Sequence, residues 1–446
     1  MKAQGVFLEE RQNFIHHKGS CEGKTIQCDT ESLSGAVSQR ACVYCGARVV
    51  LNPITDAFHI VHGPIGCASY TWDIRGSLSS KDECYRNSFS TDLKEQDVIF
   101  GGEKKLWDAL SEVALTHSPK VIFVYATCIV GVIGDDVKAV CKKAEEKYNI
   151  RVIPVMSPGF AGHKSIGYRM ACNAIMELIS KAPPKVKRDK SVNILGDFNL
   201  AGEMWIIKGY LEAMGIGVVS KITGDASCEE LLHAGEASLN IVQCAGSMTY
   251  LARQMEEVMG IPFIKVSFFG LEDTAQSLIH IAQALCDEDA KKKARELITK
   301  ETQSLKDLLL RSQECLGGKR AAIYVGGGFK AISLIKQFRE IGMEAVVVGT
   351  QTGKKEDYDI IHQLIKEGTI VLDDANPAEL EHFIKEKRAD ILVGGVKERP
   401  LAYKLGVAFL DHNHERRHPL AGFIGIRHFI EELNLSVNSP VWQYVR

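Results

Sequence analysis

Short runs of apolar, mostly β-branched residues alternate along this chain with longer amphipathic stretches. From residue 40 onward, nearly every such run is followed by a segment whose apolar residues recur at helical spacing. The runs are apolar almost throughout, as in strands buried on both faces of a parallel sheet. The pattern therefore predicts an α/β protein with doubly wound parallel sheets. Expected strands lie within residues 121–127, 150–156, 192–199, 217–223, 239–244, 262–270, 321–330, 344–350, 369–374, 391–395 and 407–413.

Breaks in the pattern divide the chain into an arm and three domains. A Pro-Pro linker at 181–185 ends the first domain, and a charged helical bridge at 287–316 ends the second. The first residues are polar, and we expect an irregular arm that becomes ordered against a partner. The predicted ranges are 1–39 for the arm, 40–185 for the first domain, 186–318 for the second and 319–446 for the third. Each domain is expected to be Rossmann-like, with ligands bound beyond the carboxyl ends of its strands.

The composition is that of a globular protein without a dominant charge. Hydrophobic residues make up 45% and charged residues 25% of the chain, and the net charge is −2. Neither nucleic acid nor a membrane is therefore expected as a partner. No apolar run reaches the length of a transmembrane helix, and the first residues lack the apolar core of a signal peptide. We expect a cytoplasmic protein whose 13 cysteines are thiols rather than disulfides.

The stretch from residue 39 to residue 75 concentrates the candidate chemistry. Cys42 and Cys45 form a C-x-x-C pair, and Cys67 follows in a Gly-Pro loop, a combination typical of a metal or redox site. Turn-forming residues are frequent here, so we expect little regular helix. The alternative is that these cysteines are buried packing residues, which is common for free cysteine.

A third thiol belongs with this stretch. Cys128 ends an expected strand, and parallel topology would bring it to the same rim as Cys42 and Cys67. A [4Fe-4S] cluster takes four thiolates that converge in space. A fourth would have to come from Cys45 or from another chain, and the pattern alone does not choose between them.

One glycine-rich turn is a candidate nucleotide site. The three glycines at 326–328 follow an expected strand but lack the spacing of a dinucleotide fingerprint or a P-loop. They indicate a tight turn, or a backbone contact to an anionic group of a bound cluster. A further alternative is a metal-free structural or nucleotide-binding α/β protein. In such a protein all these cysteines would be packing residues.

Long segments of the chain also resemble a known family. Over residues 40–446 the chain is similar to the nitrogenase component 1 superfamily, and within it to the NifE subfamily. That subfamily supplies the α-type subunits of the scaffold that matures the iron–molybdenum cofactor of nitrogenase. The superfamily resemblance lies in GPIGCASYTW, YATCIVGVIGDD, GDFNLAGEMW, NIVQCAGSMTYLARQMEE and LDDANPAELEHFIKEKRADILVGGVKE, and the subfamily resemblance in CVYCGARVVLNPITDAFHIVHGPIGCASYTWDIRG and RNSFSTDLKEQDVIFGGEKKL.

The resemblance implies a heterotetramer of two α-type and two β-type chains, with a NifN-type β subunit as partner. A [4Fe-4S] cluster lies at each α–β interface of such proteins, held by three thiolates of the α-type chain and one of the β-type chain. The matching positions are Cys42, Cys67 and Cys128. Cys45 then becomes a packing thiol or a minor candidate.

The resemblance also implies a second site, which holds the large iron–sulfur precursor of the cofactor. Cys244 matches the cysteine that binds the terminal iron of the finished cofactor in the catalytic subunit. Ala421 stands where that subunit has its histidine ligand, although a small shift in alignment would bring His418 close. Tyr168 takes the place of a substrate-side histidine, and Arg75 matches an arginine near the cofactor.

These departures favour a maturation scaffold over a turnover enzyme. A single thiolate without an opposing imidazole gives a more exchangeable grip on a cluster, and a lost histidine removes a proton source. The expected cargo is an eight-iron, carbide-containing precursor received from NifB. It gains molybdenum and homocitrate with the Fe protein NifH, which hydrolyses MgATP, and passes to apo-nitrogenase. The chain itself is expected to have no ATPase activity, and the alternative function is the catalytic α subunit of a nitrogenase-like reductase.

Overall fold

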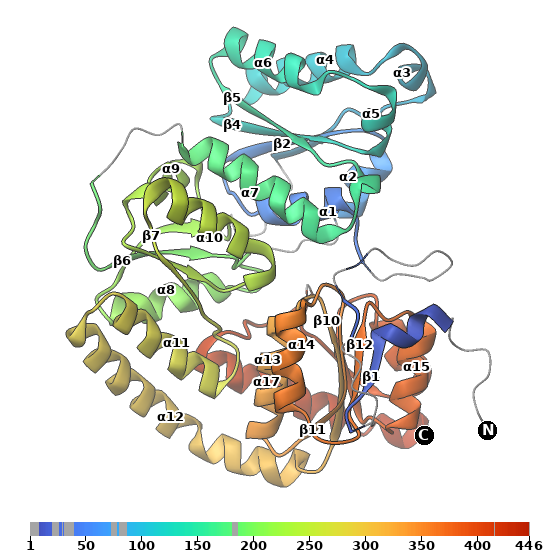
Figure 1. Cartoon of the computed structure of the whole chain (residues 1–446), viewed down its shortest axis with the longest axis vertical. Helices are drawn as coiled ribbons and strands as arrows, with labels where there is room; N and C mark the ends of the chain where they lie inside the picture. The colour runs from blue at the N-terminus through green and yellow to red at the C-terminus, as the bar shows by residue number, and fades with distance from the viewer. Residues whose placement is uncertain are drawn as a thin grey trace. The chain divides into compact units, whose positions relative to one another are not determined.

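The computed structural model describes residues 9–19, 26–28, 30, 40–72, 78–79, 87–180, 186–413 and 415–445. The chain folds into two compact units, one of residues 41–265 and one that combines residues 1–40 with residues 266–446. Three sheets with helices packed on them make up these units, and all but one of their strand pairings are parallel (Figure 1). The predicted α/β class with parallel sheets is confirmed. Within the part of the chain described, we find no helix with the length and apolar character needed to cross a membrane.

The first sheet of the 41–265 unit has the strand order β3-β2-β4-β5. Its central strand β4 is buried at every position, as the apolar run predicted. Side chains of alternate residues enter two different cores, because successive residues of a strand point to opposite faces. Ile122 and Val124 pack with α4 and α6, whereas Phe123 and Tyr125 pack with α1 and α7. The elements are α1 (Val43–Leu51), β2 (Ala57–His62), α2 (Ile65–Trp72), β3 (Ser88–Ser90), α3 (Glu95–Phe100), α4 (Glu103–His117), β4 (Val121–Ala126), α5 (Cys128–Ile133), α6 (Val137–Tyr148), β5 (Arg151–Met156), the 3-10 turn η4 (Gly159–Ala161) and α7 (Lys164–Ser180).

The second sheet of this unit has the order β7-β6-β8-β9. One apolar core extends from helix α7 and the first sheet to strands β6 and β8 and helix α10. The backbone N–H of Thr55 also donates to the carbonyl of Ala226 at 2.8 Å. The elements are β6 (Ser191–Leu195), α8 (Glu203–Ala213), β7 (Gly217–Ile222), α9 (Cys228–Leu232), η5 (Ala234–Glu236), β8 (Leu239–Val242), α10 (Ala245–Met259) and β9 (Phe263–Lys265).

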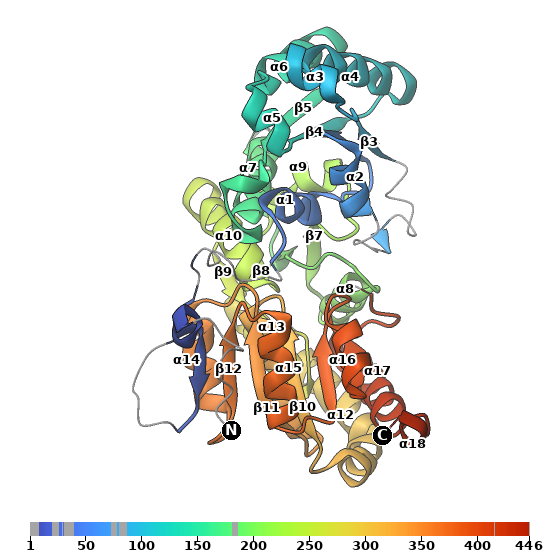
Figure 2. The same ribbon diagram turned by 90° about the vertical axis from the view of Figure 1, so that its right-hand side faces the viewer.

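The other unit is built on a single sheet with the order β1-β12-β11-β10-β13-β14 (Figure 2). The predicted charged bridge is helix α12, which spans 29 residues. The domain boundary predicted within 181–185 falls outside the described residues, and the three-domain division stays a prediction. The elements are η1 (Glu9–Phe14), β1 (Ile15–His17), α11 (Leu271–Ala284), α12 (Glu288–Leu316), β10 (Arg320–Val325), α13 (Gly328–Glu340), β11 (Glu344–Thr350), α14 (Lys355–Leu364), β12 (Ile370–Asp373), α15 (Pro377–Glu386), β13 (Ile391–Gly394), α16 (Arg399–Leu405), β14 (Ala408–Asp411), α17 (Gly422–Val437) and α18 (Trp442–Val445).

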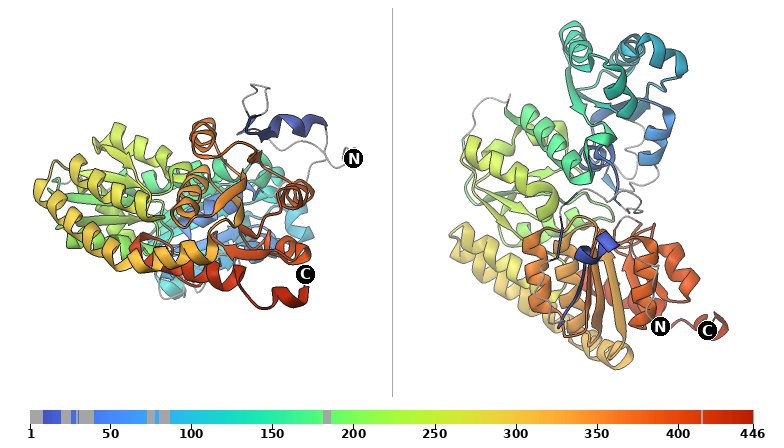
Figure 3. Two further views of the ribbon diagram at one scale, coloured as in Figure 1. Left: turned by 90° about the horizontal axis from the view of Figure 1, so that it is seen from below. Right: turned by 45° about the vertical axis from the view of Figure 1, so that its right-hand side comes forward.

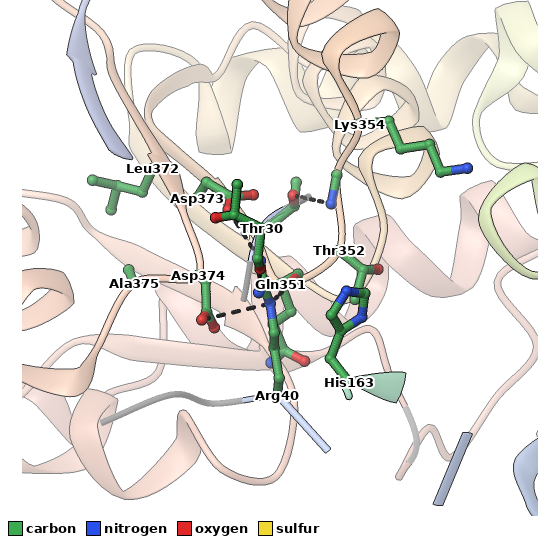
Figure 4. Close-up of polar contacts among 12 residues, drawn as sticks. Thr30, Arg40, His163, Gln351, Thr352, Lys354, Leu372, Asp373, Asp374 and Ala375 are labelled. Atoms are coloured by element: carbon green, nitrogen blue, oxygen red, sulfur yellow. Dashed lines mark hydrogen bonds and ion pairs between the residues drawn. The ribbon is translucent and has the colours of Figure 1, made fainter. Parts of the chain in front are cut away.

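Part of the predicted irregular arm is ordered against the chain's own sheet. Strand β1 pairs antiparallel with β12, and Ile15 faces Leu372 (Figure 3). Arg11 donates two hydrogen bonds of 2.8 Å to Glu379, and both side chains are buried. Burial of this charge pair and pairing with an exposed strand edge order residues 9–19 without a partner chain. Figure 4 shows a second anchor, Arg40, beside Gln351 and Asp374.

The expectation of little helix in residues 39–75 was wrong. Helix α1 begins directly after Cys42, and all nine of its residues are buried. It packs on α7, where a Cβ atom on Gly46 would strike the carbonyl of Lys164 and one on Gly167 would strike the carbonyl of Val43. Two glycines thus let two helix backbones approach closely, and tertiary burial overrides the weak helix propensity of the valines.

Candidate functional site

Three of the predicted ligand cysteines begin three different helices of the 41–265 unit. Cys42 is the N-cap residue of α1, Cys67 lies in the first turn of α2, and Cys128 is the first residue of α5. The last two helices directly follow the carboxyl ends of the neighbouring strands β2 and β4. The parallel topology therefore delivers these thiols to one edge of the sheet, as predicted from the sequence.

Cys42 and Cys128 meet at Gly159, in the turn after β5. The backbone N–H of Gly159 donates to Cys128 Sγ at 3.0 Å. An ideal Cβ on Gly159 would lie 2.9 Å from Cys128 Sγ and 3.6 Å from Cys42 Sγ, so both sulfur atoms border the same glycine. Cys67 lies close enough to both thiols for their charges to act on it.

Burial affects the protonation of two of these thiols, Cys42 and Cys67. It raises the pKa of Cys42, and hydrogen bonds from the backbone N–H groups of Cys45 and Tyr44 partly oppose that rise. Burial also raises the pKa of Cys67, with further contributions from Cys128 and Cys42, against a hydrogen bond with Thr127. Negative charge on one thiol therefore disfavours charge on the next, and a bound cation would relieve that repulsion and release protons.

A buried hydrogen-bond network holds the loops that carry Cys67 and Cys128. His62 is fully buried, with Nδ1 3.0 Å from Thr91 Oγ1 and Nε2 3.1 Å from Asp135 Oδ2. Burial lowers the pKa of His62, which favours the neutral ring. The carbonyl of His62 accepts hydrogen bonds from the backbone N–H and the hydroxyl of Thr127. The network therefore connects the residue before the Cys67 loop with the residue before Cys128.

The donor set fits an iron–sulfur cluster better than a single ion. In the described part of the chain, no three His, Cys, Asp or Glu side chains converge closely enough to hold one metal ion. The ligands of a cluster bind different irons and stand further apart, and thiolates are the ligands that such clusters take. Cys42, Cys67 and Cys128 are half-buried or exposed thiols, two of which border one glycine, and such thiols are suited to this group.

Three exposed apolar side chains lie close to these thiols in the sequence. Ile65 precedes Cys67 by two residues and is 49% exposed, and Phe160 follows Gly159 and is 64% exposed. Val132 lies one helical turn after Cys128 and is 70% exposed. We call this surface, formed by Ile65, Val132 and Phe160 around the three cysteines, the thiol face. Apolar groups gathered on one surface are typical of a binding site for another protein.

Cys45 has a different environment from the other member of its C-x-x-C pair. Its side chain is completely buried inside α1, in contrast to the partly accessible Cys42. The burial of Cys45 therefore favours the alternative in which it is a packing residue. It does not favour the alternative in which Cys45 supplies a fourth ligand.

Cys244 begins a helix in the second sheet of the same unit. It is the N-cap residue of α10, at the carboxyl end of β8, and its side chain is partly buried. A Cβ on Gly196 would lie 2.8 Å from Cys244 Cβ, so the backbone after β6 approaches closely here. Cys244 therefore lies beyond the end of a strand, as predicted. The missing side chain of Gly196 leaves room for Cys244 beside the backbone.

Helix α7 contacts the first turn of α10 through Cys172 and carries the predicted Tyr168 one turn earlier. The Cys172 thiol lies 3.5 Å from the carbonyl oxygen of Ser247 and 4.0 Å from Met248 Sδ, both in the first turn of α10. Tyr168 precedes Cys172 by one helical turn and is half-buried, with Lys164 Nζ 5.6 Å from its ring centroid. Tyr168 therefore lies on the same face of α7 as Cys172, the residue that contacts the first turn of α10.

The remaining predicted residues belong to the other compact unit or lie outside the described residues. His418 belongs to the other compact unit, where it is exposed and its ring lies 5.1 Å from that of His428. Ala421, in the same unit, is the fully buried N-cap residue of α17. Arg75 lies outside the described residues.

Sequence reasoning missed Gly159 and the pair His62 and Asp135. The sequence pattern identified Pro158-Gly159 only as the end of a strand. That strand is β5, which pairs with β4, and β4 ends two residues before Cys128. A glycine at that place was the available signal, because close approach of backbone to a ligand favours glycine. Nothing local distinguishes His62 from an ordinary core histidine.

Comparison with known proteins gives one consistent result. Residues 42–438 match the nitrogenase component 1 type oxidoreductase family. The chain is 63% identical to a Clostridium pasteurianum protein named nitrogenase iron-molybdenum cofactor biosynthesis protein NifE, over 98% of this chain and 97% of that one. It is 51% identical to a protein of the same name from Methanosarcina barkeri, with the same shares covered. A solved structure of nitrogenase Cp1 superposes with a TM-score of 0.90 at 30% identity, over 98% of this chain and 96% of that chain.

Proposed function

We propose that this chain, which belongs to the nitrogenase component 1 type oxidoreductase family and within it to the NifE group, is the α-type subunit of a scaffold for the iron–molybdenum cofactor of nitrogenase. The observation that carries the proposal is the arrangement of Cys42, Cys67 and Cys128 on an apolar, exposed face. A turnover subunit and a scaffold subunit share this face. The residues around the cargo distinguish them.

The thiol face is the proposed half of an interface with a NifN-type β subunit. Three thiolates leave a [4Fe-4S] cluster one ligand short, and Cys45 is buried away in α1. A cysteine of the β-type subunit would complete the set while its apolar residues cover Ile65, Val132 and Phe160. Bound there, the cluster supplies electron transfer from a docked reductase. We place this complex, with two chains of each type, in the cytoplasm.

Cys244 is the proposed attachment point for the cargo, an eight-iron precursor that carries a carbide. Its thiol stands at the start of a 15-residue helix, beyond the carboxyl end of β8. Tyr168 and Arg75 are proposed to contact the cargo, and His418 is a proposed second ligand. The methyl group of Ala421 cannot replace an imidazole ligand. One firm ligand suits cargo that must later leave.

The proposed reaction sequence uses partners for its chemistry. NifB supplies the precursor, and molybdenum and homocitrate are added while the cargo stays on the scaffold. The Fe protein NifH delivers electrons and hydrolyses MgATP, and apo-nitrogenase accepts the finished cofactor. The residues of this chain bind and orient the cargo, and none is proposed to hydrolyse ATP.

The test is iron analysis of variant complexes purified anaerobically with the β-type subunit. We expect Cys244→Ala to lose the precursor iron and keep the interface cluster, and Cys128→Ala to lose the interface signal in electron paramagnetic resonance. Cys315→Ala is the matched control, because Cys315 is an exposed thiol on α12 in the other unit. Full precursor iron in Cys244→Ala would refute the cargo assignment. Reduction of dinitrogen or acetylene by the wild-type complex would favour the catalytic alternative.

A further inference from the structure

Gly159 interacts with the cysteines in two ways that the formation of a turn does not require. Its backbone N–H donates to Cys128 Sγ at 3.0 Å. Its missing side chain leaves room for two cysteines, because an ideal Cβ would lie 2.9 Å from Cys128 Sγ and 3.3 Å from Cys42 Cβ. Real Cβ atoms essentially never come within 3.0 Å of another heavy atom, so any side chain would displace Cys128.

Backbone conformation does not explain the glycine. Several glycines of the chain have a positive φ angle, which favours glycine on its own, but Gly159 is not among them. An alanine could therefore adopt the backbone angles of residue 159. The restriction comes only from the space that Cys42 and Cys128 occupy.

Hydrogen bonds to cluster sulfurs have a known physical effect. An N–H group that points at a thiolate withdraws negative charge from the sulfur and stabilises the reduced, more negative form of an iron–sulfur cluster. The donor at Gly159 is held by the 3-10 turn η4, directly after Pro158, so its direction is constrained.

We propose that Gly159 is a positioning residue for the interface cluster. It orients Cys128, sets the separation of Cys128 from Cys42, and raises the reduction potential of the cluster through its N–H group. This inference rests on the proposed function, since it presupposes a cluster at the thiol face. It adds a determinant of cluster retention and potential that lies outside the cysteines themselves.

The test compares Gly159→Ala with wild type in the complex with the β-type subunit. Three quantities are measured: cluster iron, the midpoint potential from a redox titration followed by electron paramagnetic resonance, and the rate of iron loss to a chelator. We expect a more negative midpoint potential and about 10-fold faster iron loss, the usual scale for a lost supporting contact. Gly209→Ala is the control, because Gly209 is exposed on α8 and a Cβ there meets nothing within 4 Å.

The outcomes separate this inference from the proposed function. A wild-type complex without any cluster would refute the interface cluster itself. A wild-type cluster whose potential, spectrum and iron loss are unchanged in Gly159→Ala would overturn only the role of Gly159. If Gly159→Ala fails to assemble, wild-type complex labelled with ¹⁵N-glycine replaces it. Pulsed electron paramagnetic resonance of the reduced cluster should then detect a coupled glycine nitrogen, and its absence would overturn the inference.

Discussion

Arg40 and Asp373 form an ion pair inside the protein, with Nη2 3.1 Å from Oδ2 and side chains that are 4% and 0% exposed. Arg40 also lies 3.5 Å from Asp374 and donates from Nε to the carbonyl of Gln351 at 2.6 Å (Figure 4). The hydroxyl of Tyr358 donates to the other oxygen of Asp373 at 2.7 Å. A residue from the end of the arm thus neutralises carboxylates at the carboxyl end of β12.

Burial predicts an unusual pH dependence for one of these carboxyl groups, although its pairing with Arg40 and Tyr358 opposes the shift. Burial raises the pKa of Asp373 from 3.8 to about 7. Between those values the folded chain holds a proton that the unfolded chain has lost, so stability falls as pH rises from about 4 to 7. The Asp373→Asn variant lacks this loss. Its free energy of unfolding should therefore rise relative to wild type over that range, by at most about 4 kcal/mol for three pKa units, and its melting temperature should rise with it.

The measurement is thermal unfolding of both proteins from pH 4.5 to pH 8. Asp108→Asn is the control, because Asp108 lies in an exposed pair with Lys104. A constant difference between Asp373→Asn and wild type across this range would contradict the prediction.

Arg11, the other residue that anchors the arm, should contribute strongly to stability. Arg11→Leu leaves the carboxylate of Glu379 buried, with its two 2.8 Å hydrogen bonds from Arg11 gone. Removing one partner of a buried pair typically costs about 3–5 kcal/mol. Lys104→Ala breaks an exposed pair and should cost about 0–1 kcal/mol. Denaturant unfolding measures both, and equal losses in the two variants would refute the assigned role of Arg11.

The crossing of α1 and α7 should tolerate no added methyl group. Gly46→Ala would press a Cβ against the carbonyl of Lys164, and overpacking of this kind costs about 1–3 kcal/mol. Gly209→Ala places the same methyl in open space on an exposed helix position, where it should stabilise by about 0.5–1 kcal/mol. Changes of the same sign in both variants would argue against a steric role for Gly46.

Cysteine reactivity should follow exposure in the isolated chain without iron. Iodoacetamide should modify Cys128, which is exposed, and spare Cys172, whose pKa burial raises to about 12. Three pKa units above an ordinary thiol leave roughly a thousandfold less thiolate. Mass spectrometry of tryptic peptides measures both rates. In the complex with the β-type subunit and iron, Cys128 should become protected, and continued rapid labelling there would contradict its place at the interface.

The sequence anticipated elements whose signals are local. Continuous apolar runs identified β4 and β11 almost to the residue, and the charged stretch before residue 316 became α12. The chain order of strands and helices also implied parallel sheets, which placed Cys128 and Cys244 at strand ends. Local patterns failed at α1, because its helix depends on burial against α7 rather than on propensity.

What the sequence by itself determined is therefore the class of fold, the thiols available at strand ends and, through long resembling segments, the family. Which member of the C-x-x-C pair remains accessible was decided only by the tertiary structure. Cys42 and Cys45 are three residues apart, yet helix α1 buries Cys45 and leaves Cys42 at its N-cap. Gly159 joins Cys42 and Cys128 because β5 lies beside β4 in the sheet. Contacts between distant segments depend on how strands pair and helices pack, and no short stretch of sequence encodes them.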